Sequence, residues 1–459
     1  MKKLIIFLLL CVPMLCSCSG NEPNDVAYVV ALGIDKGLGD NFDITIQFAK
    51  PNTISGGASE EGGKAGNEII ENIFIEAPSI YSAINVANSV ISKEFSLSHT
   101  RIIVFSEELA REGIGDILQT FAKSDDIRPD ILLAVSRDKA SEYLKNIKPL
   151  VELNPIKYYQ LIYEKNNFGT IPKINASEVY FDIISGSKDP VMPLARVMKA
   201  PEGDESSQQV SGDSGRNSGG NSGGSSGGSS GGSGGEESGQ ENQTDLSQIQ
   251  QELNEENKIG TNQEGFQYKI KDYQAGEVAI IESDKSEALG MAVFRSDKLE
   301  AIFGKTESEI YNILNGTYDS SFVTLSANSD ESSTVTVKLH QYRRPAYKIN
   351  INDKKVTIKL YLEFDIYSFN EDDKIDENTA EFEQHCEDVM NSEFESFIKN
   401  MRDNYGSDIM GIGEKAKKCF WNLKSYKEYD WENQFPDYDI SVDTELKTRH
   451  SGLTAKEES

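Results

Sequence analysis

The stretch KVTIKLYLEFDIY, residues 355–367, decides the fold class of the C-terminal half of this chain. Apolar side chains occupy every second position from Val356 to Ile366. Successive side chains of a strand point to opposite faces of a sheet, so this period of two predicts a strand with one buried face. The side chains expected on that face are Val356, Ile358, Leu360, Leu362, Phe364 and Ile366.

Other segments of the C-terminal half extend this prediction. Residues 288–299, 334–340 and 438–446 also alternate as strands. A helix should follow the central strand, because apolar residues recur there at helical spacing. That stripe consists of Phe382, Cys386, Val389, Met390, Phe394, Phe397, Ile398 and Met401. We therefore expect an α+β arrangement, with a helix laid across an antiparallel sheet and Cys386 in the core.

The N-terminal half predicts a mixed α/β fold. Buried strands are expected within TRIIVFS (100–106) and DILLAVS (130–136), and a hairpin is expected within residues 26–49. Residues 67–77 suggest a third strand. Helices should begin at Pro78, which suits a first helical position, and around Ile114–Phe121, with a short one after Arg137. Because these strands alternate with helices, part of the sheet should be parallel.

The amino-acid composition limits the classes of protein to which this chain can belong. The 459 residues carry a formal charge of −29, which repels phosphate backbones and anionic head groups, so nucleic-acid binding is not expected. Residues 202–265 form an acidic linker whose centre reads NSGGNSGGSSGGSSGGSGG. Such a coil reaches roughly 45 Å, which predicts that it decouples the two sides; a short helix is expected near 246–253.

The expected fold class is thus mixed α/β and α+β, in several domains, three by our interpretation, with mixed sheets, flanking helices and a long flexible linker. The expected divisions are a signal peptide (1–17), an N-terminal domain (18–201), the linker (202–265), a middle α/β domain (266–345), a C-terminal α+β domain (346–452) and a polar tail (453–459).

The N-terminus reads as a lipoprotein signal. Lys2 and Lys3 precede a short apolar run, and LLLCVPMLCSCSGN (8–21) ends it with three cysteines. Leu15-Cys16-Ser17-Cys18 resembles a bacterial lipobox, in which the final cysteine is diacylated; Cys16 is a poorer candidate because bulky Leu15 precedes it. Two acyl chains would anchor the protein stably. An ordinary secretion signal and a metal site are the alternatives, and the second lacks nearby histidines.

The sequence contains few patterns that are typical of catalytic, cofactor-binding or metal-binding sites. The histidines, His99, His340, His385 and His450, show no metal-ligand spacing, so no metal, catalytic or cofactor-binding residue is assigned and no cofactor is expected. A G-x-S-x-G match at 224–228 lies in the linker. Gly411-Ile412-Gly413 fits G-x-G-x-x-A, but we interpret it as a turn into a helix. Residues 370–378 have carboxylates without a complete calcium-loop pattern. A Cys386–Cys419 disulfide stays open as a minor alternative.

Seven segments, in order, resemble spore germinant-receptor C-subunit lipoproteins, the Ger(x)C family. They are VAYVVALGIDKG, DITIQFAKP, SLSHTRIIVFSEELAREGIGDIL, DDIRPDILLAVSRDKASEYL, GMAVFRSDKLEAIFGKTES, YGSDIMGIGEKAKKCFWN and DYDISVDTELKTRHSGL. The chain departs from the family in its longer Gly/Ser linker and in lacking a tryptophan soon after the lipidated cysteine.

The resemblance implies a non-enzymatic subunit held by acylated Cys18 on the outer face of the spore inner membrane. It implies assembly with a large membrane subunit and a multi-pass, transporter-like subunit into a complex that senses nutrients and starts germination. The alternative function is a solute-binding lipoprotein of an uptake system, in which two lobes would close on a ligand; a surface hydrolase is a more distant one.

Overall fold

The computed structural model describes residues 26–49, 70–91, 93–147, 154–164, 168–197, 273–275, 286–326, 334–368 and 379–450. Several sequence-based expectations lie outside these residues. They are the signal peptide 1–17 with Cys18, the linker 202–265 with its helix near 246–253, the carboxylate-rich stretch 370–378 and the tail 453–459.

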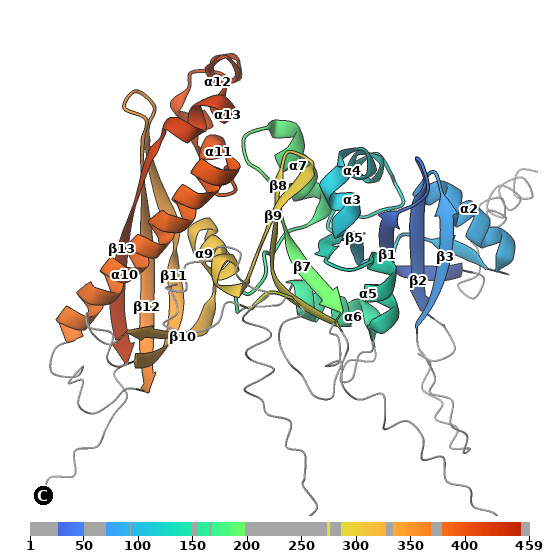
Figure 1. The fold of residues 1–459 in the computed structure, drawn as a ribbon, viewed down its shortest axis with the longest axis horizontal. Helices are drawn as coiled ribbons and strands as arrows, with labels where there is room; N and C mark the ends of the chain where they lie inside the picture. Colours follow the sequence, from blue (N-terminus) through green and yellow to red (C-terminus); the bar gives the residue numbers. More distant parts are fainter. Residues whose placement is uncertain are drawn as a thin grey trace, which may run out of the picture. The chain divides into compact units, whose positions relative to one another are not determined.

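The first sheet contains nine strands among the described residues (Figure 1). They are β1 (Val26–Lys36), β2 (Phe42–Ala49), β3 (Ile70–Ala77), β4 (Glu94–Ser96), β5 (Ile102–Ser106), β6 (Leu132–Ser136), β7 (Val191–Val197), β8 (Ser286–Arg295) and β9 (Lys298–Phe303). Their order is β3-β2-β1-β5-β6-β7-β8-β9, with β4 also paired to β1. Strands β1, β5, β6 and β7 are parallel, as predicted, and antiparallel pairs flank them.

The centre of this sheet is buried on both faces. In β5, Ile103 and Phe105 belong to one apolar core, whereas Ile102 and Val104 belong to another on the opposite face. All five residues of β5 and of β6 are buried. A continuous apolar run is the pattern of a strand covered on both sides, so IIVFS and LLAVS form these strands for that reason.

Helices connect and cover these strands. They are α2 (Ile80–Val90), α3 (Glu107–Glu112), α4 (Gly115–Ala122), α5 (Ala140–Asn146), α6 (Pro155–Tyr159) and α7 (Ala176–Ser185). The prediction that Pro78 opens α2 is wrong by two residues, because the Ser79 hydroxyl accepts from the Ser82 amide and caps the helix there. Asn175 and Glu178 form a capping box at the start of α7.

The second sheet has four strands among the described residues, in sequence order: β10 (Ser320–Ser326), β11 (Thr334–Asn350), β12 (Lys355–Ser368) and β13 (Asp439–His450). Strand β12 alternates as predicted, and its apolar face packs into one core. The helices of this half are α9 (Lys305–Asn315), α10 (Thr379–Asn400), α11 (Ile412–Ala416), α12 (Leu423–Tyr429) and α13 (Trp431–Gln434).

The second sheet is not fully antiparallel, which corrects the prediction. Strand β13 runs parallel to β12, with Val356 opposite Ile440 and Leu362 opposite Leu446. A parallel neighbour requires a crossover, and α10 supplies it, since its 22 residues span about 33 Å at 1.5 Å per residue. The alternating pattern of each strand gives its buried face but not its direction.

Helix α10 also covers the outer edge of β13. Four side chains at four-residue intervals accept hydrogen bonds from alternate amides of the strand, at 2.7–3.0 Å. The pairs are Glu383 with Thr448, Glu387 with Leu446, Asn391 with Thr444 and Glu395 with Val442. Four helical residues rise about 6 Å and two strand residues about 6.6 Å, so the two ladders stay in register. The ladder shields an edge strand that would otherwise offer its amides to another chain.

The two halves are joined by pairing and by a shared core, which corrects the expected decoupling. Val197, before the Gly/Ser-rich segment, pairs with Ser286, after it. That segment therefore connects neighbouring antiparallel strands. One core also combines Val191, Met291 and Phe303 of the first sheet with the apolar face of the second.

Two expected boundaries fall differently in the structure. Residues 288–299 form a hairpin, because the chain turns at Ser296, whose φ is 57°, before β9 begins. Strand β11 runs through residues 345 and 346, where a domain boundary was expected.

Candidate functional site

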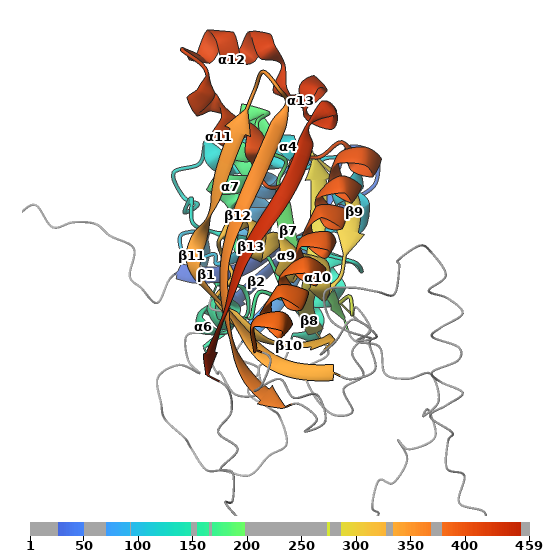
Figure 2. The ribbon, with the colours of Figure 1, turned by 90° about the vertical axis from the view of Figure 1, so that its left-hand side faces the viewer.

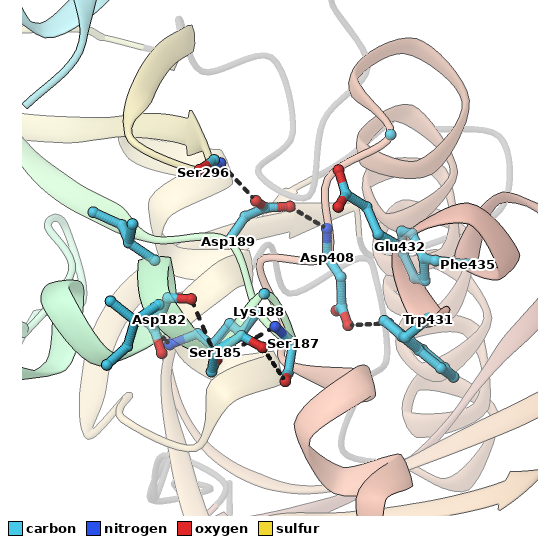
Figure 3. Close-up of a pocket in the computed structure, with 14 residues that line it drawn as sticks. Asp182, Ser185, Ser187, Lys188, Asp189, Ser296, Asp408, Trp431, Glu432 and Phe435 are labelled. Carbon is cyan, nitrogen blue, oxygen red and sulfur yellow. Dashed lines mark hydrogen bonds and ion pairs between the residues drawn. The ribbon is translucent and has the colours of Figure 1, made fainter. Parts of the chain in front are cut away.

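A pocket of about 290 Å³ lies beside the junction of the two halves (Figure 3). The end of α7 and the segment between α7 and β7 form one side, and the segments around Gly406 and Trp431 form the other. Its lining residues are Asp182, Ile183, Ile184, Ser185, Gly186, Ser187, Lys188, Asp189, Ser296, Gly406, Asp408, Trp431, Glu432 and Phe435.

Two aspartates tie the halves together at this pocket. The Asp189 amide donates to the Asp408 carbonyl at 3.1 Å, and the Asp408 amide donates to Asp189 Oδ2, also at 3.1 Å. Asp189 Oδ1 accepts from the Ser296 amide at 3.0 Å, which fixes the β8–β9 turn (Figure 3). Three segments far apart in sequence therefore converge on Asp189.

Asp408 is the second centre of the junction. Its Oδ1 accepts from the Ile412 amide at 2.9 Å, and its Oδ2 accepts from the Gly413 amide at 2.7 Å and from Trp431 Nε1 at 3.0 Å. These amides open α11, where a carboxylate is stabilised by the helix dipole. The G-x-G-x-x-A match thus forms a turn into a helix, as interpreted, with two of its amides bound to Asp408. Gly411 has a φ of 64°, which favours glycine.

Burial governs the electrostatics of the junction. Burial raises the pKa of Asp408 to about 6, although the Gly413 and Ile412 amides and Lys415 act in the opposite direction. Burial also raises the pKa of Asp189. It lowers the pKa of Lys415, whose ammonium donates to the Met410 carbonyl at 2.6 Å and lies 4.2 Å from the centre of the Tyr347 ring.

A largely buried ion pair also lines the pocket. Lys188 Nζ is 3.0 Å from Asp182 Oδ2. Burial opposes the charge on Lys188, but Tyr311 and Asp182 outweigh that effect and raise its pKa, so the ammonium stays charged.

This arrangement suits a structural joint. The carboxylate oxygens of Asp189 and Asp408 accept backbone and indole N–H groups, and Asp189 also interacts with the Ser407 hydroxyl, so both carboxylates hold the segments of the junction together. Two lobes that close on a solute need a hinge, whereas here reciprocal bonds and a common core join the halves. No group of three or more His, Cys, Asp or Glu side chains in the described ranges could hold a metal ion.

The histidines do not converge. His99 lies 3.0 Å from Ser98 Oγ and packs edge-on against Tyr28. His340 Nε2 lies 3.2 Å from Asp365 Oδ2 on the second sheet, and His385 is on α10. His450 ends β13.

The described cysteines are unpaired. Cys386 is buried in the core, as predicted, and burial raises its pKa. Cys419 is an exposed free thiol, so the Cys386–Cys419 disulfide considered from the sequence is not formed.

A second candidate site is the outward face of β10–β13, which we call the open face. It faces the viewer in Figure 2, with β11, β12 and β13 in front of α9. Two aromatic pairs lie on it: Phe322 with Tyr367, ring centres 4.9 Å apart, and Tyr342 with Tyr361, 6.1 Å apart. Phe322 is 53% exposed and Tyr367 is 60% exposed. Exposed aromatic residues in a group mark interaction surfaces.

Charged residues surround these rings. The basic residues of the open face are Lys338, Arg343, Lys348, Lys355, Lys359, Lys447 and Arg449. The acidic residues are Glu363, Asp365, Asp439, Asp443 and Glu445. Basic groups therefore outnumber acidic ones here, in a chain whose total is −29.

Sequence reasoning missed both sites. Nothing in the local sequence around Asp189 or Asp408 marks a contact between residues more than two hundred positions apart. The open face carried a usable signal, because the polar positions of residues 355–367 include Tyr361 and Tyr367 where an ordinary solvated face would hold only charged and small groups.

Two family models match the chain. Residues 19–197 match the spore germination protein N-terminal domain, and residues 289–452 match the spore germination B3/GerAC like, C-terminal model. Together they cover most of the chain.

Known relatives agree with these models. The chain is 27% identical over 195 residues to spore germination protein KC of Bacillus subtilis (strain 168), covering 41% of this chain and 47% of that protein. It is 25% identical over 211 residues to putative spore germination protein YfkR of the same strain, covering 46% and 54%. The chain thus spans about half the length of the curated relatives it matches.

A solved structure is also similar. The crystal structure of the GerBC protein aligns over 91% of this chain and 96% of its own, at 12% identity and a TM-score of 0.45. Because the family models match both halves, the chain belongs to the spore germinant-receptor C-subunit family, the Ger(x)C family.

Proposed function

We propose that the chain is a membrane-anchored subunit of a nutrient germinant receptor and acts in spore germination by docking with partner subunits. The match of both halves to spore germination models is the observation that carries this proposal. The two halves share one apolar core, which suits them to presenting a fixed surface.

The proposed anchor is the thiol of Cys18, diacylated after removal of residues 1–17. The support is the sequence Leu15-Cys16-Ser17-Cys18 after a short apolar run. No helix within the described ranges is long and apolar enough to cross a bilayer. Two acyl chains, at about 0.8 kcal/mol per buried methylene, hold a soluble body at a membrane surface, here the outer face of the spore inner membrane.

The proposed partners are a large membrane subunit and a multi-pass, transporter-like subunit of the same receptor. The body of this chain is too acidic to bind anionic lipid by charge, so docking has to come from a protein surface. The open face offers aromatic and basic residues for it.

The test is Cys18→Ala in the full chain, with Cys16→Ala as the matched control. We expect Cys18→Ala to move the protein from the spore membrane fraction to the soluble fraction and to weaken nutrient-triggered germination, while Cys16→Ala leaves both unchanged. Mass spectrometry should find the acyl chains on Cys18. Normal germination with a fully soluble Cys18→Ala protein would refute the proposal.

A further inference from the structure

We propose that the open face binds an extended acidic segment of a partner protein along strand β11. This inference rests on the proposed function, because it names the surface through which the subunit would dock. The exposed aromatic pairs provide apolar contact, and a column of unpaired basic side chains provides charge complementarity.

The charge of the open face is opposite to that of its surroundings. Helix α10, on the other side of the sheet, carries six acidic residues and one lysine. The open face carries seven basic and five acidic residues. A partner that is acidic at its contact would be repelled by the helix side and attracted to the open face, which fixes the orientation of binding.

The basic charge that remains unpaired lies on β11. Lys359 and Arg449 have carboxylate partners across the sheet, at 3.5 Å to Glu445 and 3.4 Å to Glu363. Lys338, Arg343 and Lys348 have no carboxylate within 4.0 Å among the described residues. These three residues follow one another along β11, and two irregularities in its pairing with β12 keep all of them on the open face. Their partners Asp365 and Thr357 on β12 are eight residues apart, so the column spans about 27 Å, the length of an extended peptide of about eight residues.

Aromatic rings hold two of these cations on the surface. Lys338 Nζ lies 6.0 Å from the centre of the Phe322 ring, and the Arg343 guanidinium carbon lies 4.6 Å from that of Tyr361. Cation–π contact fixes the side chains and leaves their N–H groups free for carboxylates. Tyrosine and arginine are also the residues that dominate binding energy at protein interfaces.

The mixed charge of the face favours a protein over a lipid surface. Its five carboxylates would face head groups of the same sign in an anionic bilayer. A protein segment can place its carboxylates beside Arg343 and Lys348, which lie opposite Tyr361 and Thr357 of β12 and not opposite a carboxylate.

The experiment compares full-length chains purified from detergent-solubilised spore membranes. The variant is Lys338→Glu/Arg343→Glu/Lys348→Glu. The control is Lys418→Glu/Lys424→Glu/Lys427→Glu, which makes the same charge change on exposed residues near and within α12. We expect the first variant to recover at least tenfold less of the receptor's membrane subunits, identified by mass spectrometry, and the control to recover wild-type amounts. Both should keep the wild-type melting temperature.

The other possible results separate failure of the open face as a binding surface from failure of the proposed function. Equal recovery by both variants overturns this surface while leaving the proposed function, whereas a wild-type chain that brings no membrane subunit overturns the proposed function itself. If the glutamate variant does not fold, Lys338→Gln/Arg343→Gln/Lys348→Gln is used, and undiminished recovery then overturns the surface. Binding of the Cys18→Ala chain to vesicles of anionic phospholipid, lost in the triple variant, would assign the face to lipid and refute a protein segment.

Discussion

The two sheets of this molecule differ in how many of their faces are buried. In the first, β5 and β6 are buried on both sides, and successive residues enter different cores. In the second, β12 buries one face in the core and exposes the other, with aromatic and charged side chains. A partner can therefore bind flat against the second sheet, which has a free face, but not against the central strands of the first sheet, which have none.

The largest expected effect contrasts a phenylalanine from each sheet. Phe105→Ala empties a site in the two-sided core and should lower the free energy of unfolding by about 3–5 kcal/mol. Phe322→Ala, on the open face, should cost less than about 1 kcal/mol. Urea denaturation of the two variants measures the contrast, and similar losses would show that the open face is part of a core.

The junction between the sheets should be the next most sensitive place. Asp408→Ala leaves two amides and the Trp431 indole N–H buried without an acceptor, at about 1 kcal/mol each, so a total loss of roughly 3 kcal/mol is expected. Asp403→Ala, at an exposed site on the same segment, is the matched control and should be nearly neutral. Equal small effects would mean that Asp408 does not join the halves.

The edge of the second sheet gives a smaller effect. Glu387→Ala removes the acceptor of the Leu446 amide and should cost about 1–3 kcal/mol, whereas Glu387→Gln retains an acceptor and should cost less. Asp388, one position along, accepts instead from Gln384 Nε2 at 3.1 Å, so Asp388→Ala serves as the control. Thermal unfolding and light scattering measure stability and edge-to-edge association. If Asp388→Ala lowers the melting temperature as much as Glu387→Ala does, the hydrogen bonds between α10 and β13 do not stabilise this edge.

The smallest expected effect is the pH dependence of Asp408. Its pKa is about 6 in the folded chain against an ordinary 3.8, so the folded state takes up a proton first as pH falls. Its contribution to stability therefore grows below pH 6, by about 1 kcal/mol between pH 7 and 5. The cost of Asp408→Asn should rise by that amount over this range. For exposed Asp403, whose pKa is lowered by Arg402, the cost of Asp403→Asn should stay constant between pH 7 and 5 and shrink only below about pH 4.

Sequence periodicity was enough for most elements of this fold. The continuous apolar run IIVFS indicates a strand covered on both faces, and the alternation in KVTIKLYLEFDIY indicates a strand covered on one face. Both strands form as predicted. The direction of β13 could not be predicted in this way, because a parallel and an antiparallel neighbour expose the same alternation. The hairpin at Ser296 was missed because its turn, Arg295-Ser296-Asp297-Lys298, contains no glycine or proline to mark it.

The contact between the two halves could not be predicted from the sequence, for a different reason. A Gly/Ser-rich segment predicts a spacer between separate bodies, yet Val197 and Ser286 on its two sides pair in one sheet. Composition describes the segment and says nothing of what its ends contact. The Asp189–Asp408 bonds likewise depend on the tertiary fold.

Zero-length cross-linking in intact spore membranes tests the central claim most directly. A carbodiimide joins a lysine amine to a carboxylate only when the two are in contact. The account predicts links from Lys338 and Lys348 to aspartates or glutamates of a receptor membrane subunit. Links that form only through Lys418, Lys424 or Lys427, with none from β11, would contradict it.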